Sequence, residues 1–380
     1  MSSIRLTIIN ITAGGISGGY RKYLQNMIPL LVQYQEIDEI LCISPSSWGI
    51  DQWFGKVEKV TFVEHKKFNL FSKYDKKIQQ LLDDFSPDII FIPVERCFSY
   101  NNIPVVNMLQ NMEPLAYSNE GNPLLEKLRN LFRARTAKKA MESADKIIAV
   151  SRFVRSFLIQ VLKIPEGKIE LIYYGMDDAS NCNVVKPCNI SIDWEGKFIF
   201  TAGSIRPARG LEDLLQAMQY FGDESLNLVI AGEVSPNMVA YQNKLKRWIE
   251  EKGFQGRVCW AGGLVEEEMK WCYDRCKIFV MTSRVESFGQ IALEALSQGA
   301  MCISTDNPCL PELFGDAAIF YPLKDENILV EMIQTVLTWD DNQREIMSEK
   351  AKKRAAEFSW DVCAEKTVAV LAKTVGNFNR

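Results

Sequence analysis

The sequence is poor in histidine, in glycine and proline, and in long apolar runs, and each shortage excludes a class of protein. A single histidine, His65, in 380 residues rules out sites built on several histidines. Glycine and proline number only 22 and 14, too few for a fibrous or low-complexity chain. No apolar run approaches the roughly 18 residues of a membrane-spanning helix. The net charge of −4 argues against a general nucleic-acid-binding protein, so we expect no nucleic-acid partner.

The ten cysteines also lack the arrangement of a disulfide framework. They are scattered from Cys42 to Cys363, and the first residues lack the basic start and apolar core of a secretory signal. We therefore expect reduced, mostly buried thiols in a cytoplasmic protein. Cys272 and Cys276 have no second cysteine pair nearby, which argues against a zinc site. His65 stands among charged residues, so we expect it to be solvated at a strand end.

Short apolar runs alternate with longer helical patterns along the chain. Many runs are continuously apolar, as strands buried on both faces of a parallel sheet are. This alternation predicts an α/β fold with doubly wound parallel sheets. In the first half we expect strands at 6–10, 40–43, 60–63, 89–92, 105–109, 147–150 and 169–173. In the second half we expect strands at 198–202, 228–231, 258–261, 278–281, 300–304 and 318–321.

A polar, turn-rich segment at 177–193 separates two similar halves and reads as an interdomain linker. We predict a Rossmann-like domain at 1–180 and a second at 190–361, facing each other across a cleft. A helix at about 362–380 is expected to pack on the first domain. In such sheets ligands bind beyond the carboxyl ends of the strands.

The segment after the strand at 278–281 carries the strongest chemical signal. Glu286 lies in the loop at the strand's carboxyl end, and Glu294 lies in the helix that follows. Gly289 and Gln290 stand at the helix start, where N–H groups favour a phosphate. A carboxylate beside a phosphate site suits sugar hydroxyls. With equal weight, these glutamates are surface charges of an ordinary strand–helix connection.

Two other loops follow strands in the same way. After the strand at 198–202, Arg206 and Arg209 suit a diphosphate through bidentate contacts, or they belong to a basic loop before an ordinary helix. After the first strand, the loop containing Gly18 and Gly19 fails the dinucleotide spacing, because Ile16 stands where glycine is needed. There we favour close approach of a ligand to the backbone over a purely structural turn.

Taken in order, these motifs resemble the retaining GT-B glycosyltransferases of family 4. Glu286-Ser-Phe-Gly with Glu294 eight residues later is similar to the E-x₇-E signature of that family. The resemblance extends from residue 14 to residue 360. Further matching segments lie at 143–151, 172–177, 231–232, 262–264 and 358–360.

The resemblance assigns roles to individual residues. It implies that Glu286 contacts the hydroxyls of the donor sugar, that Glu294 binds the ribose, and that Arg209 supplies the charge of the usual lysine. Glu286, Arg209 and Arg206 are thus the expected catalytic residues. The other expected donor-binding residues are Gly18, Gly19, Gly203, Ser204, Leu264, Ser287, Phe288, Gly289 and Gln290.

The chain departs from the family pattern at two places. Ser204 stands where the family has arginine, and Arg206, two residues later, is the substitute that we expect. The family histidine after the fifth strand is missing, and the stretch there contains Asn111 and Glu113. Either residue is a candidate contact for the acceptor or the transferred sugar.

The resemblance implies transfer of a hexose from a UDP- or GDP-linked sugar to a saccharide or lipid-linked acceptor, with retention, in surface polysaccharide or glycan synthesis. The leaving phosphate would take the acceptor's proton, and neither a metal nor another cofactor would be needed. A sugar-nucleotide epimerase of the same architecture and a non-catalytic sugar-nucleotide-binding subunit remain as alternatives.

The segment 122–143 combines leucines with a surplus of basic residues and is predicted to be a helix. Such a helix can lie on an anionic membrane, which would place the protein at the inner face of the membrane. Alternatively, it packs its leucines inward and shows its charges to water. The basic residues are Lys127, Arg129, Arg133, Arg135, Lys138 and Lys139, and the apolar ones are Leu124, Leu125, Leu128, Leu131 and Phe132.

Overall fold

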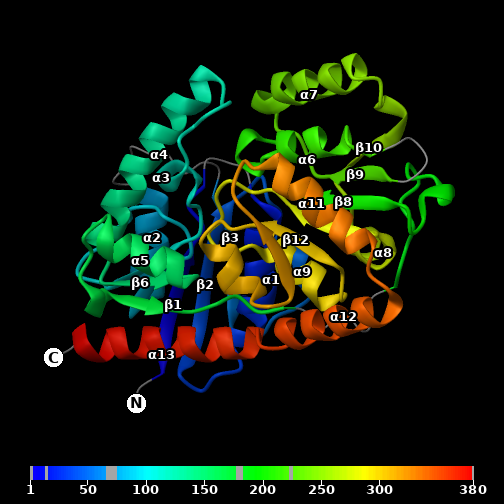
Figure 1. The fold of residues 1–380 in the computed structure, drawn as a ribbon. Coiled ribbons are helices and arrows are strands. Elements are labelled where there is room, and N and C mark those ends of the chain that lie inside the picture. Colours follow the sequence, from blue (N-terminus) through cyan, green and yellow to red (C-terminus); the bar gives the residue numbers. More distant parts are fainter. Residues whose placement is uncertain (1–2, 13–15, 66–74, 177–182, 222–225, 379–380) are drawn as a thin grey trace. The chain divides into compact units, whose positions relative to one another are not determined.

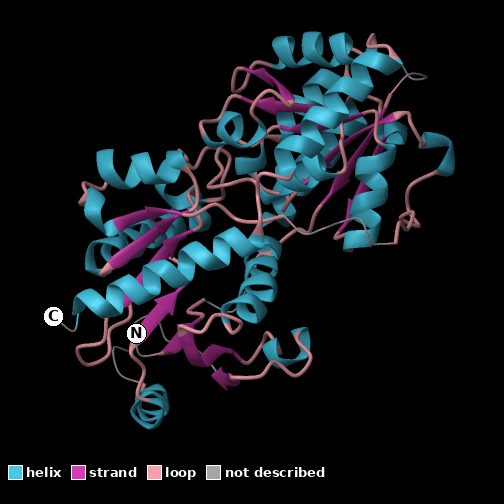
Figure 2. Cartoon of the chain, turned by 90° about the horizontal axis from the view of Figure 1, so that it is seen from below, coloured by secondary structure: helices cyan, strands magenta, loops and turns pink. Residues whose placement is uncertain are grey.

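The computed structural model describes residues 3–12, 16–65, 75–176, 183–221 and 226–378 (Figure 1). The chain forms two compact units. The first contains Met1–Asn111, Phe132–Gly175 and Ser359–Arg380, and the second contains Met112–Leu131 and Met176–Phe358. In each unit, helices cover a parallel sheet (Figure 2).

The sheet of the first unit has seven parallel strands in the order β3-β2-β1-β4-β5-β6-β7. Its central strands are wholly apolar or nearly so and are buried, because helices cover them on both faces. The strands are β1 (Ile4–Ile9), β2 (Ile37–Pro45), β3 (Val60–His65), β4 (Ile89–Ile92), β5 (Val105–Leu109), β6 (Lys146–Ala149) and β7 (Ile169–Leu171).

Helix α1 (Gly18–Leu31) packs against α13 (Trp360–Phe378), the last helix of the chain, within this unit. Ser17 caps α1 by accepting a hydrogen bond from the Tyr20 N–H. Trp360 begins α13 and packs its ring against Tyr23 and Tyr174, at centroid distances of 6.0 Å each. The other helices of this unit are α2 (Lys76–Phe85), α5 (Arg152–Gln160) and the second part of α4 (Leu124–Ser143).

The second unit has a six-stranded parallel sheet in the order β10-β9-β8-β11-β12-β13. Its strands are β8 (Phe198–Ala202), β9 (Asn227–Ala231), β10 (Val258–Gly262), β11 (Ile278–Met281), β12 (Cys302–Thr305) and β13 (Ala318–Tyr321). Its longer helices are α6 (Leu211–Met218), α7 (Val239–Glu251), α8 (Glu266–Arg275), α9 (Gln290–Ser297), α11 (Glu326–Leu337) and α12 (Asp341–Ala355). Its shorter helices are α3 (Glu113–Ala116) and α10 (Cys309–Phe314).

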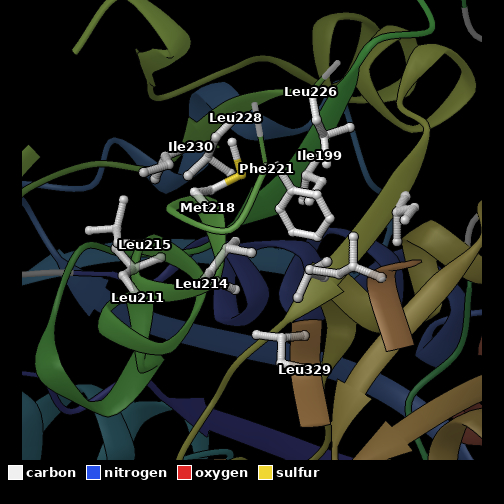
Figure 3. Packing of buried hydrophobic residues seen from close by; sticks show 14 of the residues in the cluster. Ile199, Leu211, Leu214, Leu215, Met218, Phe221, Leu226, Leu228, Ile230 and Leu329 are labelled. Carbon is white, nitrogen blue, oxygen red and sulfur yellow. The ribbon is translucent and has the colours of Figure 1, made fainter. Parts of the chain in front are cut away.

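The core of the second unit lies between its sheet and helices α6, α7 and α11. Leu214 and Met218 of α6 and Leu329 of α11 pack with Ile199 and Leu228 of the sheet, and all five are buried (Figure 3). Because α6 starts directly after the loop that follows β8, this packing fixes the end of that loop.

The structure confirms the predicted α/β class, and each expected strand is present with ends shifted by a few residues at most. Residues 112–131, expected in the first domain, belong to the second unit instead. Ion pairs and hydrogen bonds explain the difference, because Glu113, Glu120 and Glu126 bind side chains of the second unit. Part of the expected linker, 177–182, lies outside the described residues.

Two expectations about individual side chains have different outcomes. His65 is buried at the end of β3, and its Nε2 lies 2.7 Å from Asp75 Oδ2, so the expectation of a solvated residue was wrong. The charged neighbours of His65 do not predict its exposure, because only one face of this strand end is exposed. All cysteines of the described part are free, and five of them are buried, as expected.

Candidate functional site

The loops after β8 and β11 lie side by side at the carboxyl edge of the second sheet. These two strands are neighbours, and the strand order reverses between them, which is where ligands bind in open α/β sheets. The loops are tied together, because the Arg284 N–H donates to the Ala208 carbonyl at 2.8 Å and the Thr282 hydroxyl donates to the Arg209 carbonyl at 2.6 Å. The two segments singled out in the sequence thus form one site.

Arg209 and Glu286 form an ion pair at the centre of this site. Ser283 completes the cluster, since its hydroxyl accepts from Arg209 Nη1 at 3.1 Å and donates to Glu286 Oε1 at 2.9 Å. The Glu286 and Arg209 side chains are mostly buried, and Ser283 is fully so. Electrostatic interactions are stronger in such partly dry surroundings than in water.

Glycines allow the loops of this site to pack closely. A Cβ on Gly232 would lie 1.9 Å from the Gly203 carbonyl oxygen, and one on Gly210 would lie 2.3 Å from the Thr282 carbonyl oxygen. A Cβ on Gly203 would lie 2.9 Å from Arg209 Nε. All three glycines have positive φ, so the backbone also favours glycine there. The position of Arg209 depends on this close packing.

Helix α9 begins at this edge with Gly289 as its N-cap, at a φ of 103°. Within the described chain, no side chain caps this helix start. The preceding Phe288 is buried and packs edge-on against Phe358, at a centroid distance of 5.8 Å. One turn into the helix, the Glu294 carboxylate accepts a hydrogen bond of 3.3 Å from the Tyr273 hydroxyl. The helix therefore starts where the sequence predicts, and Glu294 lies within it as expected.

Arg206 and Glu113 are 93 residues apart in sequence, and they pair directly. Arg206 Nη1 lies 2.6 Å from Glu113 Oε2, and the Glu113 side chain is only 9% exposed. The sequence analysis assigned one residue to the diphosphate and the other to the acceptor or sugar. The structure instead shows both in one ion pair within the second unit, near the loop that carries Arg209.

The remaining predicted residues fall in two groups. Gly203, Ser204, Leu264, Ser287 and Gln290 lie in the second unit, in loops after β8, β10 and β11 or at the start of α9. Gly18, Gly19 and Asn111 lie in the first unit. Gly18 and Gly19 are the exposed first residues of α1, and residues 13–15 of the glycine-rich loop lie outside the described residues.

Sequence reasoning missed Ser283 and a buried ion pair beneath the site. Arg284 makes a bidentate contact with Asp213 of α6, at 2.7 and 3.1 Å. Burial raises the pKa of Asp213, and the hydrogen bonds and charge of Arg284 lower it. The pair joins α6 to the loop that carries Glu286. Ser283 was detectable, since it lies in the singled-out segment three residues before Glu286, but its hydrogen bond with Arg209, 74 residues away, was not.

Two kinds of feature are absent from the described residues. They contain no group of three or more His, Cys, Asp or Glu side chains that could hold a metal ion. No helix among them combines the length and the apolar character needed to cross a membrane.

Comparison with models of protein families identifies the family to which this chain belongs. The model of "Glycosyltransferase Family 4" matches residues 18–180, and that of "Glycosyl transferases group 1" matches residues 189–354. The chain belongs to the GT-B glycosyltransferases of family 4. The two matches correspond to the two halves recognised in the sequence, and the second contains Arg209, Glu286 and Glu294.

Individual relatives of this glycosyltransferase family member are distant. The chain is 26% identical to the O-antigen chain mannosyltransferase B of Escherichia coli, over 62% of this chain and 63% of that protein. It is 24% identical to an N-acetylgalactosaminyltransferase of Campylobacter jejuni that acts on a diphospho-undecaprenol-linked sugar, over 90% of this chain and 93% of that protein. The alignments with the Escherichia coli mannosyltransferases span between 30% and 63% of those proteins.

Solved structures establish the same fold. HepE of Anabaena in complex with UDP-glucose superposes with a TM-score of 0.74 at 17% identity, over 97% of this chain and 100% of that chain. The two parallel-sheet, Rossmann-like units of this glycosyltransferase family member are therefore those of the GT-B fold.

Proposed function

We propose that this protein transfers a hexose from a UDP- or GDP-linked sugar to a hydroxyl of a saccharide or lipid-linked acceptor, with retention of configuration. The observation that carries the proposal is the cluster of Arg209, Ser283 and Glu286 at the switch point of the second sheet. A guanidinium group binds and neutralises a diphosphate, and a carboxylate accepts hydrogen bonds from sugar hydroxyls. The diphosphate and the sugar of a nucleotide sugar thus each have a binding partner in one cluster.

In this mechanism, the second unit stabilises the leaving group. Arg209, Arg206 and the start of α9 stabilise the negative charge that develops on the diphosphate. Glu286 orients the donor sugar and supports its positive charge, and Glu294 binds the ribose. Both arginines pair with carboxylates in this structure, so donor binding includes a partial exchange of carboxylate for phosphate.

The leaving phosphate itself takes the proton of the acceptor hydroxyl on the same face of the sugar. No side-chain base is then needed, which agrees with a chain that has one histidine, buried beside Asp75. The arginines and the helix start replace a divalent cation, so the reaction is metal-independent.

The names of two relatives support a proposal for the acceptor and for the cellular location. The Escherichia coli relative is named for O-antigen chains and the Campylobacter relative for an undecaprenol-linked sugar. We propose synthesis of a surface polysaccharide or related glycan, on the cytoplasmic side of the membrane.

The test measures donor binding and then the product. Each of a panel of UDP- and GDP-hexoses is added to the protein, and the cognate donor raises the melting temperature because it binds the native state. Transfer from that donor to octyl glycosides is then followed by NMR, which reads the anomeric configuration of the product. An inverted anomer contradicts retention. Release of an epimerised sugar nucleotide without an acceptor would instead identify an epimerase.

Helix α4 supports a membrane contact. Its first half buries polar residues and exposes apolar ones, because Glu126 and Asn130 are buried while the five large apolar side chains of 124–132 are 39% to 73% exposed. Glu126 accepts a hydrogen bond of 2.7 Å from Asn237, and Asn130 donates one of 2.7 Å to Asn119, which fixes this orientation. The leucines therefore do not pack inward, contrary to the alternative that the sequence left open.

The membrane contact is tested by vesicle sedimentation. We expect binding to anionic but not neutral liposomes, because each basic residue near the surface contributes about 1 kcal/mol. Changing Arg129, Arg133 and Arg135 to Glu abolishes binding. The matched control changes three exposed basic residues on and just after α7 to Glu, and it leaves vesicle binding intact. These residues are Lys244, Arg247 and Lys252. Wild-type protein that stays in the supernatant with anionic vesicles at low salt contradicts the proposal.

A further inference from the structure

The first sheet has a switch point of its own, between β1 and β4. Strands β2 and β3 lie on one side of β1, and β4 to β7 lie on the other. Asn10 directly follows β1, and Glu95 lies three residues after β4, at the carboxyl edge. The equivalent position in the second unit carries Arg209 and Glu286. By the same topological rule, Glu95 stands where a ligand of the first unit binds.

One side chain of β5 and one from the residue just after it hold the segment around Glu95 in place. The Asn107 amide donates to the Val94 carbonyl at 3.0 Å and to the Arg96 carbonyl at 2.8 Å. The Gln110 amide donates to the Pro93 carbonyl at 2.5 Å. Arg96 Nη1 also donates to the Glu95 carbonyl at 3.2 Å. All four residues 93–96 thus have their carbonyl oxygens bonded by side chains, which fixes the backbone that presents Glu95.

The Glu95 side chain is buried, with 9% exposure, and only part of its hydrogen-bonding capacity is used. Burial raises its pKa, and Arg96 and backbone N–H groups, including those of Gln110 and Asn111, lower it. Its Oε2 is buried and has no hydrogen-bond partner in the described part of the chain. The nearby Tyr20 hydroxyl donates to Asn10 instead.

Arg96, the next residue in the chain, presents a complementary group. Its Nε is also buried and, among the described residues, has no acceptor. An unused acceptor and an unused donor on adjacent residues match two hydroxyls of a pyranose ring, since each hydroxyl both donates and accepts. Such buried unpaired groups are costly, and a ligand that satisfies both removes that cost.

We propose that Glu95 binds a hydroxyl group of the acceptor saccharide and that the carboxyl end of β4 forms part of the acceptor site. The inference rests on the proposed glycosyltransferase function, and it assigns to Glu95 the role expected from sequence for Asn111 or Glu113. Glu113 belongs to the second unit and pairs there with Arg206, whereas Glu95 belongs to the first unit.

The experiment uses the full chain saturated with UDP. Methyl glycosides of glucose, galactose, mannose and N-acetylglucosamine are tested by saturation-transfer NMR. We expect at least one to bind the wild type, and Glu95→Gln to weaken that binding by about tenfold, because hydrogen bonds to a charged group are roughly twice as strong as neutral ones. Glu58→Gln, the same change at an exposed site of the same unit, leaves binding unchanged.

Donor binding is measured in parallel by thermal shift with the cognate nucleotide sugar, and Glu95→Gln leaves it unchanged. If Glu95→Gln does not fold, Glu95→Asp, which keeps the charge but is one methylene shorter, must show the same loss. Wild-type glycoside binding by the variant overturns the inference, as does binding of no glycoside by the wild type. Absence of any nucleotide-sugar shift in the wild type refutes the proposed function, while the glycoside comparison still decides the role of Glu95.

Discussion

Single side chains of the Arg209–Ser283–Glu286 cluster carry the proposed chemistry, and their removal is the most direct test. Both Glu286→Ala and Arg209→Ala are expected to lower kcat by about a hundredfold or more, because each removes a group that stabilises transition-state charge. Donor affinity should fall less. Glu331→Ala, at an exposed site on α11, is the control and keeps full activity. Near wild-type turnover by folded Glu286→Ala would refute the assignment.

The buried ion pair of Arg284 and Asp213 is expected to contribute to the stability of the fold rather than to the reaction. Asp213→Ala leaves the Arg284 guanidinium, 11% exposed, without its bidentate partner. We expect the free energy of unfolding to fall by about 3–5 kcal/mol, as for other buried pairs that lose one member. Urea denaturation measures it. The double change Asp213→Leu with Arg284→Met should cost less than Asp213→Ala alone, and an equal or larger loss contradicts the interpretation.

At the scale of elements, the sequence predicted the strands because their periodicity and apolar runs are local properties. Strand β4 and strand β8 have the predicted bounds. Pairings between distant segments were not predictable, and Arg206 with Glu113 is the clearest case. The same limit applies to α4, since a list of its residues does not tell which face is buried. Hydrogen bonds from other segments fix that face, among them the one between Glu126 and Asn237, 111 residues apart.

The contact between the loops after β8 and β9 is an element-scale feature that one methyl group can disturb. Gly196→Ala, at a φ of 70° with open space around it, should cost about 1–2 kcal/mol through backbone strain alone. Gly232→Ala adds a clash with the Gly203 carbonyl and should cost about 1–3 kcal/mol more. It should also weaken donor binding, because the displaced loop carries Arg209. Equal unfolding free energies and equal donor affinity in the two variants would count against this account.

For the whole molecule, we expect catalysis without a divalent cation. The sequence contains Asp pairs at 83–84, 177–178 and 340–341. The first lies in α2, the last at the start of α12, and 177–178 lies outside the described residues. Activity should therefore be the same with EDTA as with added Mg²⁺ or Mn²⁺. Loss of activity in EDTA that either ion restores would show that a metal replaces the proposed role of the arginines.

The place of α13 in the first unit has a consequence for how the protein is made. All seven strands of that unit are synthesised before Gly175, but the helix that packs on α1 is synthesised only after the second unit, which ends at Phe358. At about 5–20 residues per second, the roughly 200 residues after Gly175 take about 10–40 seconds. During that interval the surface of α1 that receives Trp360 is uncovered in the nascent chain. The second unit, although it comes later in the sequence, is the first to have all of its residues synthesised.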